Sequence, residues 1–245
     1  MIFSLICVTN NQEIVSKMID SLKKQNFNNY ELIIIDTTIN HYESAVDALN
    51  DGAAKATGKY LVFLHHDILF IDNDVLFKLY NLLENEYNLG IAGAAGAPLN
   101  GGKTIGNLLH GIKKERICDT LIDKPVSVQS VDECFFIIPR YVYQKYSMDN
   151  NNKTWHLYSV EYSLSVKEQG YNVKVLPLNV YHASKGSSIN LSFYKELFRL
   201  AKIYKKKLKN INTPMGYWST NYYKIRYQAT KHYIKCLFLI KFNSK

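Results

Sequence analysis

Short apolar runs alternate along this sequence with longer segments whose apolar residues recur at helical spacing. The apolar runs are typical of buried strands and cover residues 3–8, 30–36, 60–64 and 89–97. The segments between them are typical of amphipathic helices and cover residues 10–25, 43–58 and 73–86. Strands that alternate with helices usually pair in parallel. The pattern therefore predicts an α/β fold, a mostly parallel twisted sheet with helices on both faces.

The second half of the chain has a less regular pattern. Residues 98–130 contain four glycines and no clear period. After them we expect strands over 131–140 and 171–184, a helix over 156–170, and helical segments over 191–210 and 222–242. Gly170 is the expected end of the helix. We divide the chain into a domain over residues 1–190 and a basic, aromatic-rich helical extension over 191–245.

Charge supports this division. The net charge of +9 is uneven, because residues 185–245 carry fourteen Lys and Arg against one acid, Glu196. Residues 1–184 carry sixteen basic and twenty acidic residues. Such asymmetry indicates a basic arm that meets an anionic surface.

Other features exclude some classes of protein. The four cysteines are scattered without CxxC spacing, which argues against a thiolate metal site. No cationic segment precedes the N-terminal apolar run, and no window approaches the roughly 18 apolar residues of a spanning helix. We expect a cytoplasmic chain, with peripheral association at the inner face of the cell membrane as the alternative. Neither a GxGxxG fingerprint nor a P-loop motif is present.

Polar residues stand where three predicted strands end. Thr9 follows the first strand, Asp36 the second, and His65-His66-Asp67 the third. In open parallel sheets, ligands bind outside the carboxyl ends of the strands. His65 and Asp67 are two residues apart on an extended backbone and point to the same side, so they can share one divalent cation.

These strand ends resemble a known family. In order, "SLICVTNN", "YELIIIDTT" and "AKATGKYLVFLHHDI" resemble the N-terminal half of family 2 glycosyltransferases with the GT-A fold. The lead-in to the family's Asp-x-Asp metal motif is matched by Ala56, Gly58, Lys59, Tyr60 and Leu61. The motif itself reads His65-His66-Asp67, with histidine in place of the first aspartate.

The second half extends the resemblance to residues 2–190. "VDECFFIIPR" is similar to the family's strand that faces the acceptor. "WHLYSVEYSL" and "KEQGYNVKVLPLNVYHASKGS" resemble its acidic helix start, its Gly-Tyr-x-Val strand and its late histidine. The resemblance implies a metal-dependent glycosyltransferase, a hexosyltransferase type that moves a sugar from a nucleoside diphosphate sugar, with inversion.

The resemblance also implies roles for individual residues. The implied metal ligands are His65, Asp67 and His182, with Mn²⁺ favoured over Mg²⁺ because of the imidazoles. The implied nucleotide contacts are Thr9, Asp36, His66 and Lys185. The implied general base is Glu161, although Ser159 stands where the family has an acid, and Asp132 is the alternative. Trp155 and His156 are candidates for the sugar or acceptor pocket.

Each of these residues also has a purely structural interpretation. Asp36, His66 and Asp67 could start turns, and Glu161 could favour a helix N-terminus. His182, Trp155 and His156 could be packed and satisfied in the core, and Lys185 could be an ordinary exposed lysine.

The basic extension favours an anionic membrane surface over nucleic acid, because aromatic and basic residues interleave and no RNA-binding motif is present. A saccharide or lipid-linked acceptor in bacterial polysaccharide biosynthesis is the expected setting. The main alternative function is a non-catalytic nucleotide-sugar-binding module that partners an active transferase. A nucleotidyltransferase would need a glycine-rich loop after the first strand, where this chain has "VTNNQE".

Overall fold

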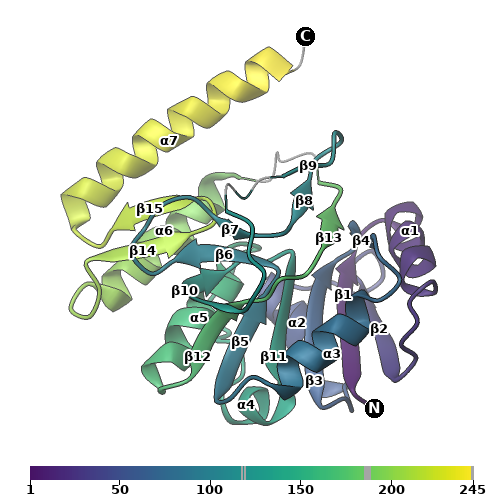
Figure 1. The fold of residues 1–245 in the computed structure, drawn as a ribbon. Coiled ribbons are helices and arrows are strands. Elements are labelled where there is room, and N and C mark those ends of the chain that lie inside the picture. The colour runs from purple at the N-terminus through teal and green to yellow at the C-terminus, as the bar shows by residue number, and fades with distance from the viewer. Residues whose placement is uncertain (117, 119, 185–188, 244–245) are drawn as a thin grey trace.

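The computed structural model describes residues 1–116, 118, 120–184 and 189–243, with side chains described up to residue 236. Within these residues a nine-stranded sheet forms the centre of the molecule (Figure 1). Its strands, in spatial order, are β2 (Tyr30–Asp36), β1 (Phe3–Thr9), β3 (Tyr60–His65), β11 (Phe135–Pro139), β5 (Leu89–Gly93), β12 (Asn172–Val175), β10 (Val126–Val131), β6 (Ala95–Pro98) and β7 (Ile105–Gly106).

Most strands of this sheet run in one direction. The pairs β1–β2, β1–β3 and β5–β12 are parallel. The exceptions are β11, β10 and β7, which run antiparallel to their neighbours in this sheet. The predicted mostly parallel α/β sheet is confirmed, with one strand from the second half, β11, inserted between β3 and β5.

Helices cover both faces of the sheet, as predicted. On one face α1 (Gln12–Leu22) and α3 (Val75–Glu84) pack on strand residues such as Leu5 and Val62. On the other face α2 (Ala45–Ala54), α4 (Arg140–Lys145) and α5 (Tyr158–Glu168) pack on residues such as Ile6 and Phe63. Neighbouring residues of a strand thus enter opposite cores, as the pleat requires.

Local signals explain where these helices begin and end. The Asn11 side chain caps α1 by accepting the backbone N–H groups of Glu13 and Ile14 at 3.0 and 3.1 Å. Gly170 follows α5 with φ of +85°, a left-handed conformation that ends the helix at the expected residue.

Three predicted strands are wrong in their bounds. The predicted strand 171–184 divides into β12 in the large sheet and β13 (Val180–His182) in a second, smaller sheet, because residues 176–179 lie in no strand. The run 89–97 divides into β5 and β6 at Ala94, whose N–H bonds the carbonyl of Phe135. The predicted strand 131–140 begins only at Phe135, because Val131 ends β10 and Asp132 turns the chain by accepting the N–H of Cys134 at 2.9 Å. Apolar residues continue through Ala94, so the pattern alone does not show that break. Asp132 and Glu133 do interrupt the apolar pattern before Phe135, and the prediction wrongly included them in the strand.

A smaller sheet lies beside the carboxyl end of the large one. Within the described residues it has four strands, β4 (Ile68–Phe70), β13 (Val180–His182), β8 (Leu109–His110) and β9 (Glu115–Arg116). In this sheet β13 pairs antiparallel with β4, which places His182 opposite Ile68. The pairing brings a late segment of the chain against the turn that follows β3.

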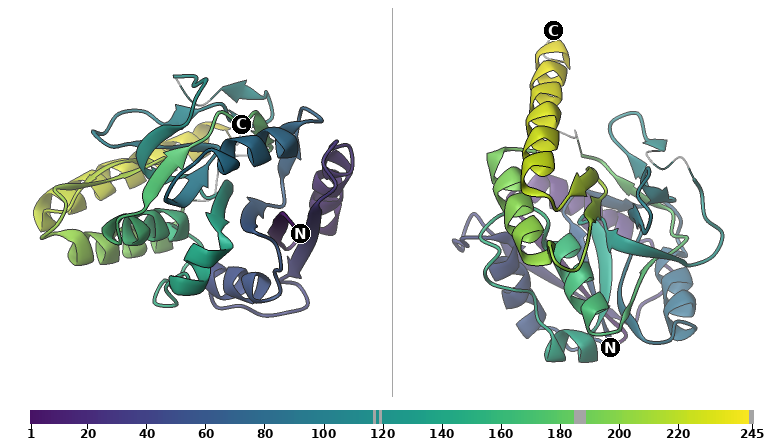
Figure 2. Two further views of the ribbon diagram at one scale, coloured as in Figure 1. Left: turned by 60° about the horizontal axis from the view of Figure 1, so that its bottom comes forward. Right: turned by 90° about the vertical axis from the view of Figure 1, so that its left-hand side faces the viewer.

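The C-terminal part begins with α6 (Leu191–Tyr204), which packs against α5. A hairpin that was not predicted follows, β14 (Asn210–Thr213) and β15 (Gly216–Ser219), and then α7 (Tyr222–Asn243). Trp218 of the hairpin and Leu197 of α6 belong to the same buried cluster as Leu164 of α5. The later turns of α7 project from the body (Figures 1 and 2). Among the described helices, none is both long and apolar enough to cross a membrane.

Candidate active site

A pocket of about 490 Å³ opens at the carboxyl ends of β1 and β3. The ends of the first three strands are in register, since Thr9 pairs with Asp36 and Val8 with His65. The predicted site residues that line the pocket are Thr9, His65, His66, Asp67, Trp155 and His182. The fold therefore gathers most of the predicted residues around one cavity.

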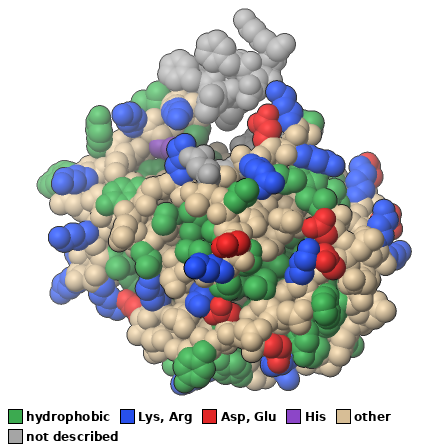
Figure 3. Space-filling model, in the orientation of Figure 1, with side chains coloured by type: hydrophobic (Ala, Val, Ile, Leu, Met, Phe, Trp, Pro, Cys, Tyr) green, Lys and Arg blue, Asp and Glu red, His purple; other side chains and the backbone are tan. Residues whose placement is uncertain are grey.

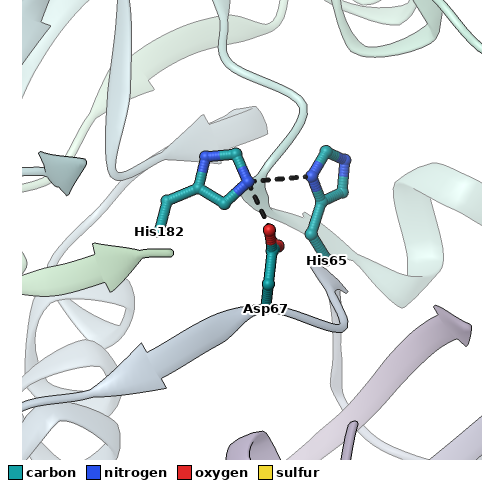
Figure 4. A group of neighbouring side chains, drawn as sticks. All are labelled: His65, Asp67 and His182. Carbon is teal, nitrogen blue, oxygen red and sulfur yellow. Dashed lines mark hydrogen bonds and ion pairs between the residues drawn. The ribbon is translucent and has the colours of Figure 1, made fainter. Parts of the chain in front are cut away.

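Three of these residues converge on one point (Figure 4). His65 Nδ1 lies 3.3 Å from His182 Nε2, which in turn lies 3.2 Å from Asp67 Oδ1. One potential ligand atom from each residue lies within 4.8 Å of the other two. The backbone explains the arrangement, because the N–H of Ala183 donates to the carbonyl of Asp67 at 3.0 Å and fixes β13 beside the turn after β3.

The chemistry of this cluster suits a divalent cation. Burial and the neighbouring His182 lower the pKa of His65 to about 4, so its imidazole is neutral and able to coordinate at neutral pH. Burial acts to raise the pKa of Asp67, but the hydrogen bond and charge of His182 hold it below its usual value. Oδ1 of Asp67 is buried and, apart from that contact, has no hydrogen-bond partner among the described residues. Two imidazoles and a carboxylate are a ligand set for Mn²⁺ or another first-row ion.

Neighbouring side chains orient the two adjacent histidines. The Tyr158 hydroxyl lies 3.0 Å from His65 Nε2, and Thr9 Oγ1 lies 2.9 Å from His66 Nδ1. Such outer contacts fix the ring orientation of a ligating histidine. The ring of His110, on β8, meets that of His182 at 5.1 Å. Tyr158 and His110 were not predicted. Tyr158 lies within the "WHLYSVEYSL" segment, but nothing in that segment indicated a contact with His65, and His110 lies in no motif.

The remaining predicted nucleotide contacts lie at the edge of the pocket or outside the described residues. Asp36 accepts the N–H and hydroxyl of Thr38 at 2.8 and 2.6 Å, and these bonds lower the pKa of its carboxyl. Asp36 is not in the pocket lining, although the adjacent Thr37 is. Lys185 falls in the segment 185–188, outside the described residues.

The two aromatic candidates separate in the structure. Trp155 is 44% exposed and lines the pocket. His156 is buried, and its ring packs edge-on against Phe193 of α6 at 5.9 Å. His156 thus lies with the C-terminal helices and outside the pocket lining.

The two candidate bases also occupy different surroundings. Glu161, on α5, forms a close ion pair with Arg199 of α6, which also binds Glu196. Burial raises the pKa of Glu161 to about 7, although Arg199 opposes this. Asp132 lies in the turn between β10 and β11, near the cluster, since its charge acts to raise the pKa of both His65 and His110. Only the second candidate is electrostatically close to the histidines.

The adjacent Glu133 was missed by the sequence analysis. It lines the pocket from the turn before β11. An acid beside Asp132 in "VDEC" was visible in the sequence, but nothing there indicated that its side chain enters the cavity.

The sheet topology and this site define a GT-A type of glycosyltransferase fold. Residues 4–197 match the family model described as "Glycosyltransferase like family", so the chain belongs to that family. The predicted family 2-like glycosyltransferase and its fold are thereby confirmed. Comparison with the sequences of curated proteins finds no match.

Solved structures with the same fold include three glycosyltransferases of low sequence identity. TarS of S. aureus has a TM-score of 0.56 and 14% identity, over 85% of this chain and 40% of TarS. GalNAc-T7, solved with UDP, GalNAc and Mn²⁺, has a TM-score of 0.61 and 14% identity, over 83% of this chain and 48% of that one. The mannosyltransferase PcManGT of Pyrobaculum calidifontis was solved with GDP-Man and Mn²⁺. It has a TM-score of 0.52 and 12% identity, over 82% of this chain and 61% of PcManGT. This chain thus spans less than two thirds of each.

Proposed function

We propose that this chain transfers a sugar from a nucleoside diphosphate sugar to a hydroxyl of a polysaccharide, glycolipid or other glycoconjugate, with inversion at the anomeric carbon. The observation that carries the proposal is the convergence of His65, Asp67 and His182 within 4.8 Å at the mouth of a cavity of about 490 Å³. Family membership supplies the class of reaction, and the site supplies the means of handling a diphosphate.

The donor is the better supported of the two substrates. TarS has been solved with UDP-GlcNAc and PcManGT with GDP-Man, so donors with either base fit this fold. We assign the nucleotide to the pocket at Thr9 and His66, with Asp36 as a contact next to the lining residue Thr37 and Lys185 as a further phosphate contact. The strand-end position of the first three residues is typical of nucleotide contacts in open α/β sheets.

We assign the metal to His65, Asp67 and His182, and favour Mn²⁺ over Mg²⁺ because two ligands are imidazoles. A bound cation would neutralise the charge of the leaving diphosphate. The protein orients one of these ligands by itself, because the hydroxyl of Tyr158 lies 3.0 Å from His65 Nε2 and fixes the orientation of that ring.

For the general base we favour Asp132 over Glu161. Asp132 lies in the turn that also carries Glu133, which lines the pocket, whereas Glu161 is paired with Arg199. A base must reach the acceptor hydroxyl, and its loss typically slows a reaction by about 10²- to 10⁴-fold. We expect Asp132→Asn to lower kcat by this factor. Glu161→Gln should keep kcat within about threefold of the original chain, a change much smaller than the usual effect of losing a base.

The test is turnover of a panel of UDP- and GDP-sugars with MnCl₂ and oligosaccharide or lipid-linked acceptors. Transfer that Asp67→Ala abolishes supports the proposal. Binding of nucleotide sugars without turnover across the panel supports the alternative, a non-catalytic module that partners an active transferase. Absence of binding to every nucleotide and nucleotide sugar would refute both.

We also propose that the C-terminal part docks on an anionic membrane surface. A groove of about 1030 Å³ runs between the end of α6, the β14–β15 hairpin and the start of α7, and it is lined by Lys205, Lys206, Lys207, Lys209 and Lys224. Lys207 pairs with Glu168 at 2.7 Å, and the described residues show no ion pair for the other four. Exposed Tyr217 and Tyr222 also line it. Basic side chains gather over this end of the molecule, at the left of Figure 3.

Vesicle co-sedimentation tests this surface. The charges of Lys205, Lys206, Lys209 and Lys224 are removed together by substitution with Gln. Near an anionic bilayer each lysine contributes about 1 kcal/mol, so binding to phosphatidylglycerol vesicles should fall at least about tenfold. The matched control removes four exposed lysines of the opposite end, Lys17, Lys23, Lys24 and Lys55, and should bind like the original chain. Equal loss in both variants would contradict a specific docking surface.

A further inference from the structure

Glu133 lines the active-site pocket and carries a buried carboxyl oxygen that has no partner among the described residues. It lies in the turn between β10 and β11 and lines the same cavity as His65, Asp67 and Trp155. Its Oε1 is buried and has no hydrogen-bond partner among the described residues. A buried polar atom without a partner costs about 1–3 kcal/mol, so such an atom in a cavity indicates a missing ligand group.

Part of this carboxyl has a structural role at the N-terminus of α5. The residue before the helix, Leu157, has φ of +61° and provides no side-chain cap. The backbone N–H groups of Leu157 and Tyr158 donate to the Glu133 carboxyl instead. A carboxyl from a distant turn thus satisfies the helix end. Capping accounts for these two donors, but it leaves Oε1 without a partner among the described residues.

A sugar hydroxyl is the group that this oxygen suits. A hydroxyl can both donate and accept, so it pairs with the carboxyl in either protonation state. Burial raises the pKa of Glu133 well above its usual value, which makes the carboxyl a poor ligand for a cation. Trp155 lines the same pocket and offers an aromatic face to the apolar side of a sugar ring.

We propose that Glu133 binds a hydroxyl of the transferred sugar and selects donors that carry a hydroxyl at that position. This inference rests on the proposed glycosyltransferase function and adds the residue that discriminates among donor sugars. A site built to hydrogen-bond a hydroxyl rejects an analogue that lacks it far more strongly than an apolar pocket does, because its polar atom is otherwise left unpaired.

The test compares binding of a nucleoside diphosphate with binding of its sugar conjugate, by calorimetry in MnCl₂. The probes are UDP and GDP against UDP-GlcNAc, UDP-Glc, UDP-Gal and GDP-Man. Glu133→Met removes the polar atoms at similar length, and Glu133→Gln keeps an acceptor for the helix and a polar atom toward the pocket. Glu115→Met, on exposed β9, is the matched control.

We expect Glu133→Met to weaken binding of the preferred nucleotide sugar by at least about tenfold and to leave the nucleoside diphosphate within about twofold. Glu133→Gln should retain part of the preference for the sugar conjugate, and Glu115→Met all of it. An equal fall in both affinities, or no fall in either, would overturn the inference while the proposed function stands. If the unmodified chain binds none of these nucleotides, the proposed function fails and this inference fails with it.

Discussion

Replacing Arg199 with methionine should destabilise this protein strongly, because Arg199 compensates two buried carboxylates. Its Nε donates to both carboxylate oxygens of Glu196, at 2.8 and 3.0 Å, and a terminal nitrogen binds Glu161. The side chains of Glu161 and Glu196 are only 10% and 3% exposed, against 26% for Arg199. This cluster joins α5, which packs on the nine-stranded sheet, to α6 of the C-terminal part.

The magnitude follows from the uncompensated charges. Removing one partner of a buried ion pair typically costs about 3–5 kcal/mol, since the remaining charge is left desolvated. For a chain of this size each kcal/mol lowers Tm by about 2–4 °C, so the expected loss is roughly 6–20 °C. Removing one of the acids as well, in Arg199→Met with Glu161→Gln, should recover roughly 1–2 kcal/mol.

The loss should also depend on pH. Burial raises the pKa of Glu161 to about 7 while Arg199 opposes the rise, so removing Arg199 raises the pKa further. A carboxyl with a higher pKa in the folded than in the unfolded state binds more protons when folded. Stability then falls as pH rises from the usual glutamate value, about 4.3, through the folded pKa. The variant should therefore be closer to the original chain at pH 5 than at pH 8.

Urea unfolding at pH 5 and pH 8, followed by circular dichroism, measures both effects. Arg226→Met is the matched control, because Arg226 is exposed on α7 and contacts only the hydroxyl of Tyr222 among the described hydrogen bonds. The control should stay within about 0.5 kcal/mol of the original chain, as surface substitutions usually do. The reasoning is refuted if Arg199→Met loses less than about 1 kcal/mol at pH 8, well under the usual cost of a broken buried pair.

Three further predictions concern the core and the metal. Gly58→Ala would place a Cβ 2.6 Å from the backbone nitrogen of Ser4, so we expect the free energy of unfolding in urea to fall by about 1–3 kcal/mol. Unchanged stability would show that β1 shifts freely. Phe63→Ala removes a ring whose centroid lies 4.9 Å from that of Phe136, and the free energy of unfolding should fall by about 3–5 kcal/mol in the same assay. A fall of less than about 1 kcal/mol would contradict the observed packing. Saturating MnCl₂ should stabilise the chain by about 2.7 kcal/mol at a hundred times Kd, and Asp67→Asn should lose that stabilisation; an equal Tm rise in both would exclude this site.

The sequence alone predicted the fold class because its signals are local. Buried strands and amphipathic helices differ in hydrophobic period, so β1, β2, β3, the run that holds β5 and β6, and the first three helices were visible in order. The short strand β4 was not predicted. Parallel strands end at a common edge, which predicts that Thr9, Asp36 and the His65–Asp67 pair surround one cleft. Of these, Thr9, His65 and Asp67 line the pocket, and Asp36 does not. The break at Ala94 was missed because apolar residues continue through it. The start of β11 was misplaced although Asp132 and Glu133 interrupt the apolar pattern before Phe135.

Tertiary structure decided which side chains meet. His182 reaches Asp67 because β13 pairs with β4, and hydrophobic period carries no information on which distant strands pair. In the same way, α6 brings Arg199 to Glu161, and the turn before β11 brings Glu133 to the start of α5. These contacts join residues from 24 to 115 positions apart in the chain. Their formation depends on packing and on the burial of charge, which only the folded chain specifies.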